Sequence, residues 1–391
     1  MPGSSDALHL AVALDGTGWH PASWREPDAR PADLFTAGYW TDLALEAERG
    51  LVDFVTIEDG LTLQFDHPLR ADARTDRVRG RLDATLIAAR VAPRTRHVGL
   101  IPTVVVTHTE PFHASKAIAT LDYVSSGRAG IRVQVTARPE AARHFGRRTA
   151  PADVDDLFTE AAEYVEVVRR LWDSWEDDAE IRDVATGRFI DRDKLHYIDF
   201  HGSRFSVKGP SITPRPPQGQ PIVAALGHVE QAYRLIASSA DVGFVTPHDA
   251  SETTALVDEI AAHRGDRPPV RVLADLVVFL DDTQQQASAR RGRLDEVAGA
   301  EYRSDAEIFV GTANQLADLL QQWHAAGAAG FRLRPATLPH DLRQITANLV
   351  PELQSRGLFR TSYPGGTLRD TLGLSRPANR YSTHSTIEER V

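Results

Sequence analysis

The clearest pattern of hydrophobic and polar positions lies in Val98–Thr136, where an apolar run, a helical repeat and a second apolar run follow one another. Val98–Ile101 and Val104–Val106 are rich in β-branched residues, which favours a buried strand. Pro111 suits the first turn of a helix, because its missing N–H has no helical partner to lose there. The segment therefore predicts a strand, a helix and a second, parallel strand joined by a right-handed crossover.

The same alternation of strand and helix recurs along most of the chain. The expected strands are Leu8–Leu14, Val52–Ile57, Val98–Ile101, Ile131–Val135, Ile222–Leu226, Val242–Val245, Val270–Phe279 and Gly330–Leu333. The expected helices outside the opening unit are Phe35–Arg49, Leu82–Val91, Asp153–Trp172, Val229–Ser238, Glu252–His263, Asp282–Ala298, Ala313–Ala326 and Leu342–Arg356. Eight strands separated by helices predict an α/β fold, specifically a (β/α)8 TIM-like barrel.

Two stretches interrupt this alternation. Asp173–Gln220 is too long for a routine barrel loop and shows no helical period, so we expect an insertion between strands four and five. Within it, Tyr197–Phe200 and Phe205–Val207 predict a hairpin. The extension Gly357–Val391 is mostly polar and should wrap the outside or reach a partner subunit. We expect one domain over residues 1–391, because the strands on each side of the insertion need the other half to close a sheet.

Composition narrows the functional classes. The chain has 391 residues, of which 42% are hydrophobic and 25% charged, as in ordinary globular proteins. A net charge of −10 without a basic stripe argues against nucleic acid and favours a small-molecule ligand. The absence of cysteine excludes disulfides, thiolate nucleophiles and zinc–thiolate sites. No run of 18 apolar residues and no signal-peptide pattern occur, so we expect a cytoplasmic protein without a membrane partner.

Polar residues that follow barrel strands should gather at one mouth of the barrel, where TIM-barrel enzymes carry their chemistry. The candidates at such positions are Asp59, Thr103, His108, Glu110, Arg132, Thr136, His228 and His248. Glu58 and Asp59 are adjacent, so at most one of them should face the pocket. The loop with Trp19 and His20 could wall a pocket for an aromatic ligand, or it could be a lid that packs over the mouth.

Several other chemistries find little support in the sequence. Asp59, His108 and His113 are of metal-ligating types, but no HxH or HExxH spacing fixes three ligands, so no metal site is expected. The chain has no GxSxG elbow and no GxxxxGK[ST] loop, which argues against a serine hydrolase and against nucleotide hydrolysis. The cluster Arg143–Arg148 could attract an anion or could be a solvated loop.

Four segments carry a more specific signal. They are TGWHPASWREP at Thr17–Pro27, GLIPTVVVTHTEPFHASKAIATLDYVSSGRAG at Gly99–Gly130, LWDSWEDDAEIRDVATGRFIDRDKLHYIDFHGSRFSVKGP at Leu171–Pro210 and GLFRTSYPGGTLRDTLGLSRPANRY at Gly357–Tyr381. With these segments the chain resembles the bacterial-luciferase-like flavin monooxygenases, in particular the group that includes nitrilotriacetate and dibenzothiophene-sulfone monooxygenases. The resemblance extends over nearly the whole length.

This resemblance implies a barrel that binds reduced FMN at its C-terminal mouth and oxygenates a small organic substrate with O2. A separate NAD(P)H:flavin reductase would supply the reduced flavin, and the chain would form a homodimer or tetramer. By position, the resemblance places Asp59 and Thr103 beside the flavin ring and the loop with Trp19 and His20 beside the substrate. The predicted site is then His20 and His108 as catalytic residues, with Asp59, Thr103, Arg132, Thr136, Gly227 and His228 binding the cofactor.

The chain also departs from the family pattern at positions close to the flavin. An expected asparagine is Arg132, an expected Arg-Tyr pair is Leu157-Phe158, and an expected serine near the phosphate is Val229. FMN should therefore bind weakly unless Arg132, His228 or the Arg143–Arg148 cluster reaches its phosphate. Two hypotheses follow: an active two-component monooxygenase with an altered flavin site, or a non-catalytic binding or accessory subunit with the same fold.

Overall fold

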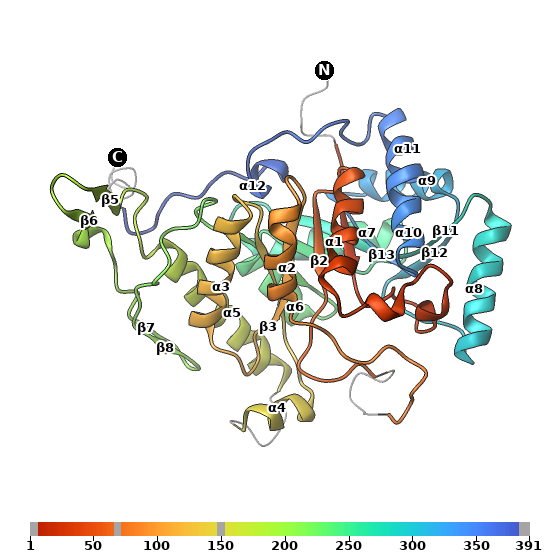
Figure 1. Ribbon diagram of the computed structural model, residues 1–391, viewed down its shortest axis with the longest axis horizontal. Coiled ribbons are helices and arrows are strands. Elements are labelled where there is room, and N and C mark those ends of the chain that lie inside the picture. The colour runs from red at the N-terminus through yellow and green to blue at the C-terminus, as the bar shows by residue number, and fades with distance from the viewer. Residues whose placement is uncertain (1–6, 66–71, 147–152, 383–391) are drawn as a thin grey trace.

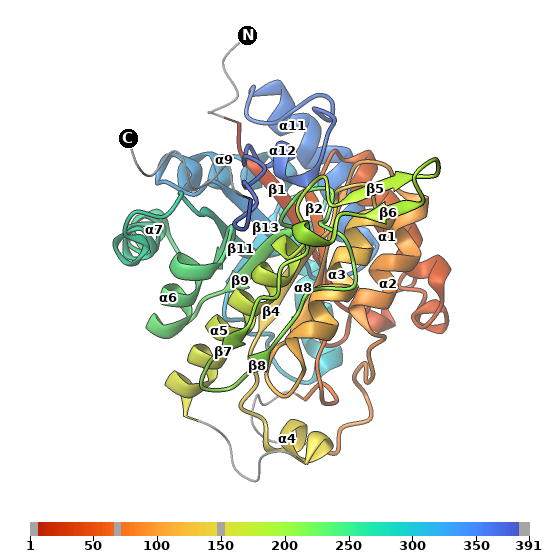
Figure 2. The same ribbon diagram turned by 90° about the vertical axis from the view of Figure 1, so that its left-hand side faces the viewer.

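The computed structural model describes residues 7–65, 72–146 and 153–382. In these residues eight parallel strands close into a barrel, with neighbours in the order β10, β9, β4, β3, β2, β1, β13 and β11, and β11 returns to β10 (Figure 2). The barrel strands are β1 (His9–Leu14), β2 (Phe54–Ile57), β3 (Gly99–Val105), β4 (Gly130–Gln134), β9 (Ile222–Leu226), β10 (Val242–Val245), β11 (Arg271–Leu280) and β13 (Gly330–Pro335). The predicted (β/α)8 fold and its eight strands are confirmed.

Helices cover the outside of the barrel (Figure 1). The longer ones are α1 (Ala37–Arg49), α2 (Ala84–Val91), α3 (Pro111–Val124), α5 (Val154–Asp173), α6 (Glu230–Ser239), α7 (Ala250–Arg264), α8 (Gln284–Ala298) and α9 (Ala313–Ala325). α5 shows why they lie there: Ala161, Tyr164, Val165 and Val168 recur at helical spacing, and all are buried. The apolar stripes of the helices therefore cover the outer face of the barrel sheet.

Outside the insertion, the structure differs from the predicted elements in three places. β12 (Glu307–Gly311) was not predicted, and it pairs with Leu276–Leu280 of β11, after the residues Arg271–Ala274 of the same strand that pair with β10. α4 (Pro139–Phe145) is a short helix where a loop was the alternative, and Arg147 and Arg148 lie outside the described residues. The last predicted helix is divided into α10 (His340–Gln344), a π-helical turn and α11 (Val350–Ser355).

Pro351 explains the interruption of this last helix. Proline has no N–H for the preceding turn, and its ring needs extra space there. The chain widens into a π-helical turn over Ile345–Leu349, in which the Val350 N–H bonds to the carbonyl of Ile345.

The insertion between β4 and β9 contains two hairpins. The hairpin of β7 (Phe200–His201) and β8 (Ser206–Val207) was expected, whereas that of β5 (Glu180–Asp183) and β6 (Arg188–Ile190) was not. Ile198 and its neighbours pack on the outer face of α5. The insertion therefore adds a layer to the helix shell and does not enter the barrel.

The C-terminal extension closes the end of the barrel where the strands begin. Its helix α12 (Leu368–Thr371) lies over the barrel on the side opposite α4 (Figure 1). Leu368 and Leu372 are buried against Phe54 and other interior residues of β1, β3, β9, β10 and β11. Gly99 permits this approach, since an added Cβ there would lie 2.6 Å from Leu368 Cδ1. The extension is thus a plug of this chain's own barrel.

Arg128 ties the start of β3 to the end of α3. Its buried guanidinium donates to the carbonyls of Ser125 (2.7 Å), Val98 (2.8 Å) and Ala92 (2.8 Å). It also donates to the hydroxyl and the carbonyl of Thr95 at 2.9 and 3.1 Å. One side chain therefore satisfies several carbonyls that would otherwise be buried without donors.

Replacing Arg128 by methionine should lower the free energy of unfolding by about 3 kcal/mol or more, because buried carbonyls lose charged donors. Arg128→Lys keeps the charge but has fewer donors, and it should cost less. Urea denaturation of the three proteins measures both effects. Equal stability of Arg128→Met and the native chain would contradict this role.

Candidate active site

Charged side chains fill the interior of the barrel above its apolar lower layer. Glu58 follows β2, Arg132 lies on β4, Asp275 on β11, and Arg332 and Arg334 on β13. All five are buried, at 7% exposure or less. The sequence pattern singled out Arg132 and the pair Glu58-Asp59, but it did not single out Asp275 or the two arginines of β13. Because a strand alternates its faces, the spacing of Arg332 and Arg334 places both on the same face.

Asp275 is the centre of this layer. Its carboxylate accepts hydrogen bonds from Arg332 Nε at 2.9 Å and from Arg334 Nε at 2.9 Å. Burial opposes ionisation of Asp275, but the two guanidinium groups outweigh it and lower the pKa of the carboxyl. The Arg332 guanidinium also lies 4.0 Å from the ring centroid of Phe244, in cation–π contact. Asp275 is therefore an ionised anchor for two buried cations.

Glu58 and Arg132 form a second buried pair. Arg132 Nη1 donates to Glu58 Oε2 at 2.7 Å and to Thr103 Oγ1 at 2.7 Å. Glu58 Oε1 lies 3.7 Å from Arg332 Nη1, which connects this pair to the Asp275 cluster. Burial alone would raise the pKa of Glu58, but Arg132 and Arg332 lower it below its ordinary value. Thr103 and Arg132, both predicted site residues, are thus brought together.

Three buried polar atoms in this region have no hydrogen-bond partner among the residues that the structure describes. They are Trp19 Nε1, Glu58 Oε1 and Arg132 Nε. The guanidinium carbon of Arg334 lies 4.7 Å from the ring centroid of Trp19. Trp19 therefore belongs to the same mouth. Buried donors and acceptors in native proteins are normally paired, so such a group marks a place where a polar ligand can bind. Two donors and one acceptor suit the polar edge of a planar ring.

His228 lies at the rim of the mouth, after β9. Its Nε2 is 3.3 Å from Asp305 Oδ2, and its Nδ1 is 3.2 Å from Thr246 Oγ1. Burial lowers the pKa of His228, although Asp305 partly opposes this change. Asp305 also accepts from Arg334 Nη1 at 2.7 Å. A neutral imidazole at the rim is therefore linked to the buried cluster through one carboxylate.

Asp59 points away from the interior, toward the start of α2. Its Oδ2 accepts from the Ala84 N–H at 2.9 Å, and its Oδ1 accepts from the Gly60 N–H at 2.6 Å. Burial raises the pKa of this carboxyl. Of the adjacent carboxylates, Glu58 faces the interior and Asp59 fixes the loop beside it, in agreement with the opposite faces expected for neighbouring strand residues.

His20 is fully buried in the loop after β1. Its Nδ1 accepts from the Ala22 N–H at 3.1 Å, so the proton of the neutral ring lies on Nε2, which donates to Asp295 at 3.1 Å. Burial lowers the pKa of His20 despite this carboxylate. Both ring nitrogens are engaged, and the imidazole holds the loop on the rings of Phe279 and Tyr302.

His108, the other histidine predicted to be catalytic, lies outside the charged layer. It stacks on Phe145 with ring centroids 5.6 Å apart, and its φ of +74° is uncommon for a side-chain-bearing residue. Together with Tyr164 it lines an apolar pocket of about 450 Å³ between α2, α3 and α5. The structure therefore separates His108 from the cluster around Arg132.

The remaining predicted residues have backbone roles. The Thr136 N–H donates to Thr107 Oγ1 at 3.1 Å, joining the ends of β4 and β3. An added Cβ at Gly227 would lie 2.6 Å from the ring of Tyr233, so this position admits only glycine without movement. His248 is at the rim, where its Nδ1 is 3.2 Å from Glu307.

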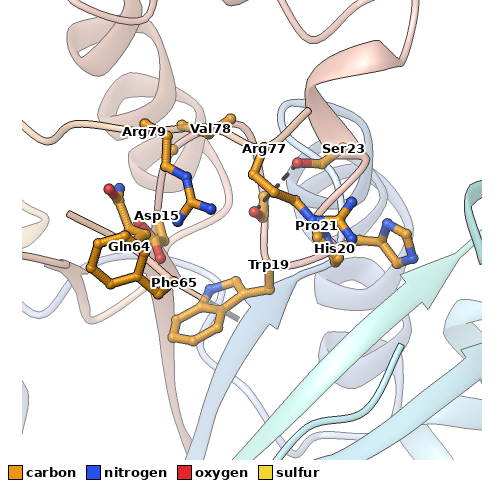
Figure 3. A pocket seen from close by; sticks show the side chains of 12 residues that line it. Asp15, Trp19, His20, Pro21, Ser23, Gln64, Phe65, Arg77, Val78 and Arg79 are labelled. Atoms are coloured by element: carbon orange, nitrogen blue, oxygen red, sulfur yellow. Dashed lines mark hydrogen bonds between the residues drawn. The ribbon is translucent and has the colours of Figure 1, made fainter. Parts of the chain in front are cut away.

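A small pocket of about 130 Å³ opens beside the mouth (Figure 3). Trp19, His20 and Asp15 line it from the loop after β1, and Phe65 and Arg79 line it from the loop after β2. The Arg79 guanidinium lies 5.0 Å from the Phe65 ring centroid. The loop with Trp19 and His20 therefore lines a cavity and also lies at the mouth. The two interpretations of its sequence, a pocket wall and a lid, are compatible with each other.

Two negative findings apply to the described ranges only. No group of three or more histidine, aspartate or glutamate side chains within them could hold a metal ion. None of their helices combines the length and the apolar composition needed to span a bilayer.

Comparisons with known proteins now identify the family. Residues 18–307 match the family model described as luciferase-like monooxygenase. The chain belongs to this family. It is 32% identical to N-acetyl-S-(2-succino)cysteine monooxygenase of Bacillus subtilis (strain 168), over 98% of this chain and 100% of the relative. It is 29% identical to nitrilotriacetate monooxygenase component A of Aminobacter aminovorans, over 96% and 98%.

Solved structures of this kind share the fold. EDTA monooxygenase from Chelativorans sp. BNC1 superposes with a TM-score of 0.83 at 24% identity, covering 95% of this chain and 99% of that one. The resemblance inferred from the sequence segments is thus confirmed, and the chain is a luciferase-like monooxygenase.

The mouth fits one end of a flavin better than the other. The unpartnered atoms of Trp19, Glu58 and Arg132 suit the polar edge of the ring. At the positions expected near the phosphate, Leu157 is buried, Phe158 is half-buried and Val229 is exposed. None of these three side chains can donate a hydrogen bond. Among the described residues, those of the mouth therefore fit the ring, and the three side chains at the positions expected near the phosphate do not fit that group.

Proposed function

We propose that the chain is the oxygenating component of a two-component system. In this proposal a separate NAD(P)H:flavin reductase supplies reduced FMN, and the chain uses O2 to oxygenate a small organic substrate. The observation that carries the proposal is the group of buried, unpartnered polar atoms of Trp19, Glu58 and Arg132 at the barrel mouth. A relative whose name identifies it as component A, and two further relatives named subunits A and B of pristinamycin IIA synthase, support a multi-component system.

The side chains of the mouth have separable roles in this proposal. Arg132 and Trp19 donate to the ring, while Glu58 and Thr103 hold the Arg132 guanidinium in place. Asp59 fixes the neighbouring loop by capping α2. The chemistry that a bound reduced flavin supplies is the two-electron activation of O2.

Residues at the rim cover and tune the site. The loop held by His20 excludes water from the mouth, which strengthens every polar interaction inside. His228 lies at the rim with its Nε2 3.3 Å from Asp305 Oδ2. Gly227 leaves room for Tyr233 beside it, Thr136 ties β4 to β3, and His108 belongs to the neighbouring apolar pocket.

The same proposal covers the assembly of the protein. Residues 1–391 form a single domain that includes the insertion and the C-terminal extension. The chain forms a homodimer or tetramer, which light scattering at micromolar concentration can measure. A monomer under these conditions would contradict the oligomeric part only.

Isotope labelling tests the reaction. The chain would be supplied with a flavin reductase, NADH, FMN and ¹⁸O2, together with nitrilotriacetate, N-acetyl-S-(2-succino)cysteine or dibenzothiophene sulfone, the compounds named for relatives. We expect one ¹⁸O atom in an organic product from at least one compound, detected by mass spectrometry. Absence of both product and flavin binding would favour the accessory-subunit hypothesis instead.

A further inference from the structure

Carboxylates occupy the helix N-termini around most of the barrel mouth. A helix N-terminus is the usual place for a phosphate, because its free N–H groups and dipole attract anions. After β2 and β10, however, Asp83 and Asp249 accept from the Leu86 and Glu252 N–H groups, both at 2.8 Å. Glu110 is the N-cap of α3. The first turns of α2 and α7 are therefore already met by a carboxylate, and α3 begins at an acidic residue whose side chain makes no capping hydrogen bond.

The N-termini of α5 and α6 are more acidic still. Asp155 and Asp156 lie in the first turn of α5, and Glu230 lies in the first turn of α6. Asp155 Oδ1 accepts from Gln231 Nε2 at 2.7 Å, so a carboxylate bridges the two helix starts. A dianionic phosphate at this place would meet three carboxylates.

The cations that reach these turns, among the residues that the structure describes, are already paired. Arg204 Nη2 lies 2.8 Å from Asp156 Oδ1, and Arg234 forms an ion pair with Glu230. The α6 N-cap, Val229, makes no side-chain bond to the helix, whereas α1, α8 and α9 are capped by threonine hydroxyls. The interior of the mouth, in contrast, retains the unpartnered donors of Arg132 and Trp19.

We infer that this monooxygenase recognises the flavin ring and not the 5′-phosphate, so that riboflavin binds at least as tightly as FMN. This inference rests on the proposed flavin site. Like charges on neighbouring helix turns each cost a few tenths of a kcal/mol, which corresponds to a preference for riboflavin of about two- to tenfold. Because the repulsion is between exposed groups, the preference should shrink as salt is added.

Parallel titrations test the inference. The purified chain is titrated with riboflavin and with FMN, oxidised and, under anaerobic conditions, reduced, at low and at physiological ionic strength. We expect dissociation constants for riboflavin equal to or below those for FMN. FMN binding tighter than riboflavin, by more than the error of the titrations, would overturn the inference and leave the proposed function standing, whereas no binding of either ligand would overturn both.

A charge-neutralising variant identifies the residues responsible. Asp155→Asn/Asp156→Asn/Glu230→Gln keeps the side-chain shapes, and an asparagine at 155 can still accept from Gln231. We expect FMN affinity to rise about threefold or more relative to riboflavin. The matched control Asp258→Asn/Asp266→Asn/Asp318→Asn makes the same charge change on exposed residues of other elements and should leave the ratio unchanged. An equal change for both ligands in the first variant, or the same shift in the control, would overturn the inference.

Discussion

Replacing Asp275 by alanine should destabilise the protein by about 3–5 kcal/mol, the usual effect of removing one partner of a buried ion pair. The carboxylate is fully buried and accepts from Arg332 and Arg334, so its loss leaves two cations facing each other in the barrel. The control Asp318→Ala removes an exposed partner of Arg356 and should cost less than about 1 kcal/mol. Urea unfolding midpoints compare the variants.

The effect of Asp275 should also depend on pH. Its pKa is lowered in the folded state, so its stabilisation is present above its unfolded pKa of about 3.9 and is lost as the pH falls through the lower folded value. The difference between the native chain and Asp275→Ala should therefore be constant near neutrality and shrink in acid. A difference below about 1 kcal/mol at pH 7 would show that the two arginines relax into other contacts.

Replacing Arg132 by glutamine should weaken riboflavin binding by about 10- to 100-fold, since a hydrogen bond to a charged group contributes roughly 1.5–3 kcal/mol. Arg132 Nη1 is already bonded to Glu58 and Thr103, whereas its Nε is buried without a partner. Riboflavin is the better probe, because its binding does not involve the phosphate. Thr103→Val keeps the guanidinium charge and should have a smaller effect, below about tenfold.

A double variant separates binding from stability. Arg132→Gln alone leaves Glu58 without its closest cation, since Arg332 Nη1 is 3.7 Å away, and a buried carboxylate without a close partner is destabilising. In Glu58→Gln/Arg132→Gln two amides can bond to each other, so much of the stability should return while flavin affinity stays low. Recovery of both properties would show that Arg132 acts through the fold and does not contact the ligand.

The sequence predicted the barrel strands well because a parallel strand buried on both faces reads as a continuous apolar run. β9 and β10 were predicted to the residue for this reason. β12 escaped notice because, among the described strands, it pairs with β11 alone, and four of its five residues are only half-buried. The interruption of the last helix could have been expected from Pro351, which lies within the predicted span.

The site was less predictable, because its contacts depend on register. Asp275 lies opposite Arg332 only when β11 and β13 pair as observed, and no local pattern in either strand specifies that pairing. Likewise, the sequence showed that Glu58 and Asp59 face opposite ways, but the direction of each side chain follows from the position of α2. The roles of His20, His108 and the other predicted site residues remain predictions for the experiments above.

The order in which β13 and the plug helix α12 are synthesised affects how the barrel can fold. β1 is made before the other described strands, yet one of its two neighbours, β13, is made after all the other barrel strands, and α12 follows later still. At about 5–20 residues per second, this delay is on the order of tens of seconds. During that time the apolar side chains around Phe54 and Ile101, at the end of the barrel where the strands begin, are not covered by Leu368 and Leu372. The nascent barrel should therefore depend on chaperones until α12 has been synthesised and can pack against it.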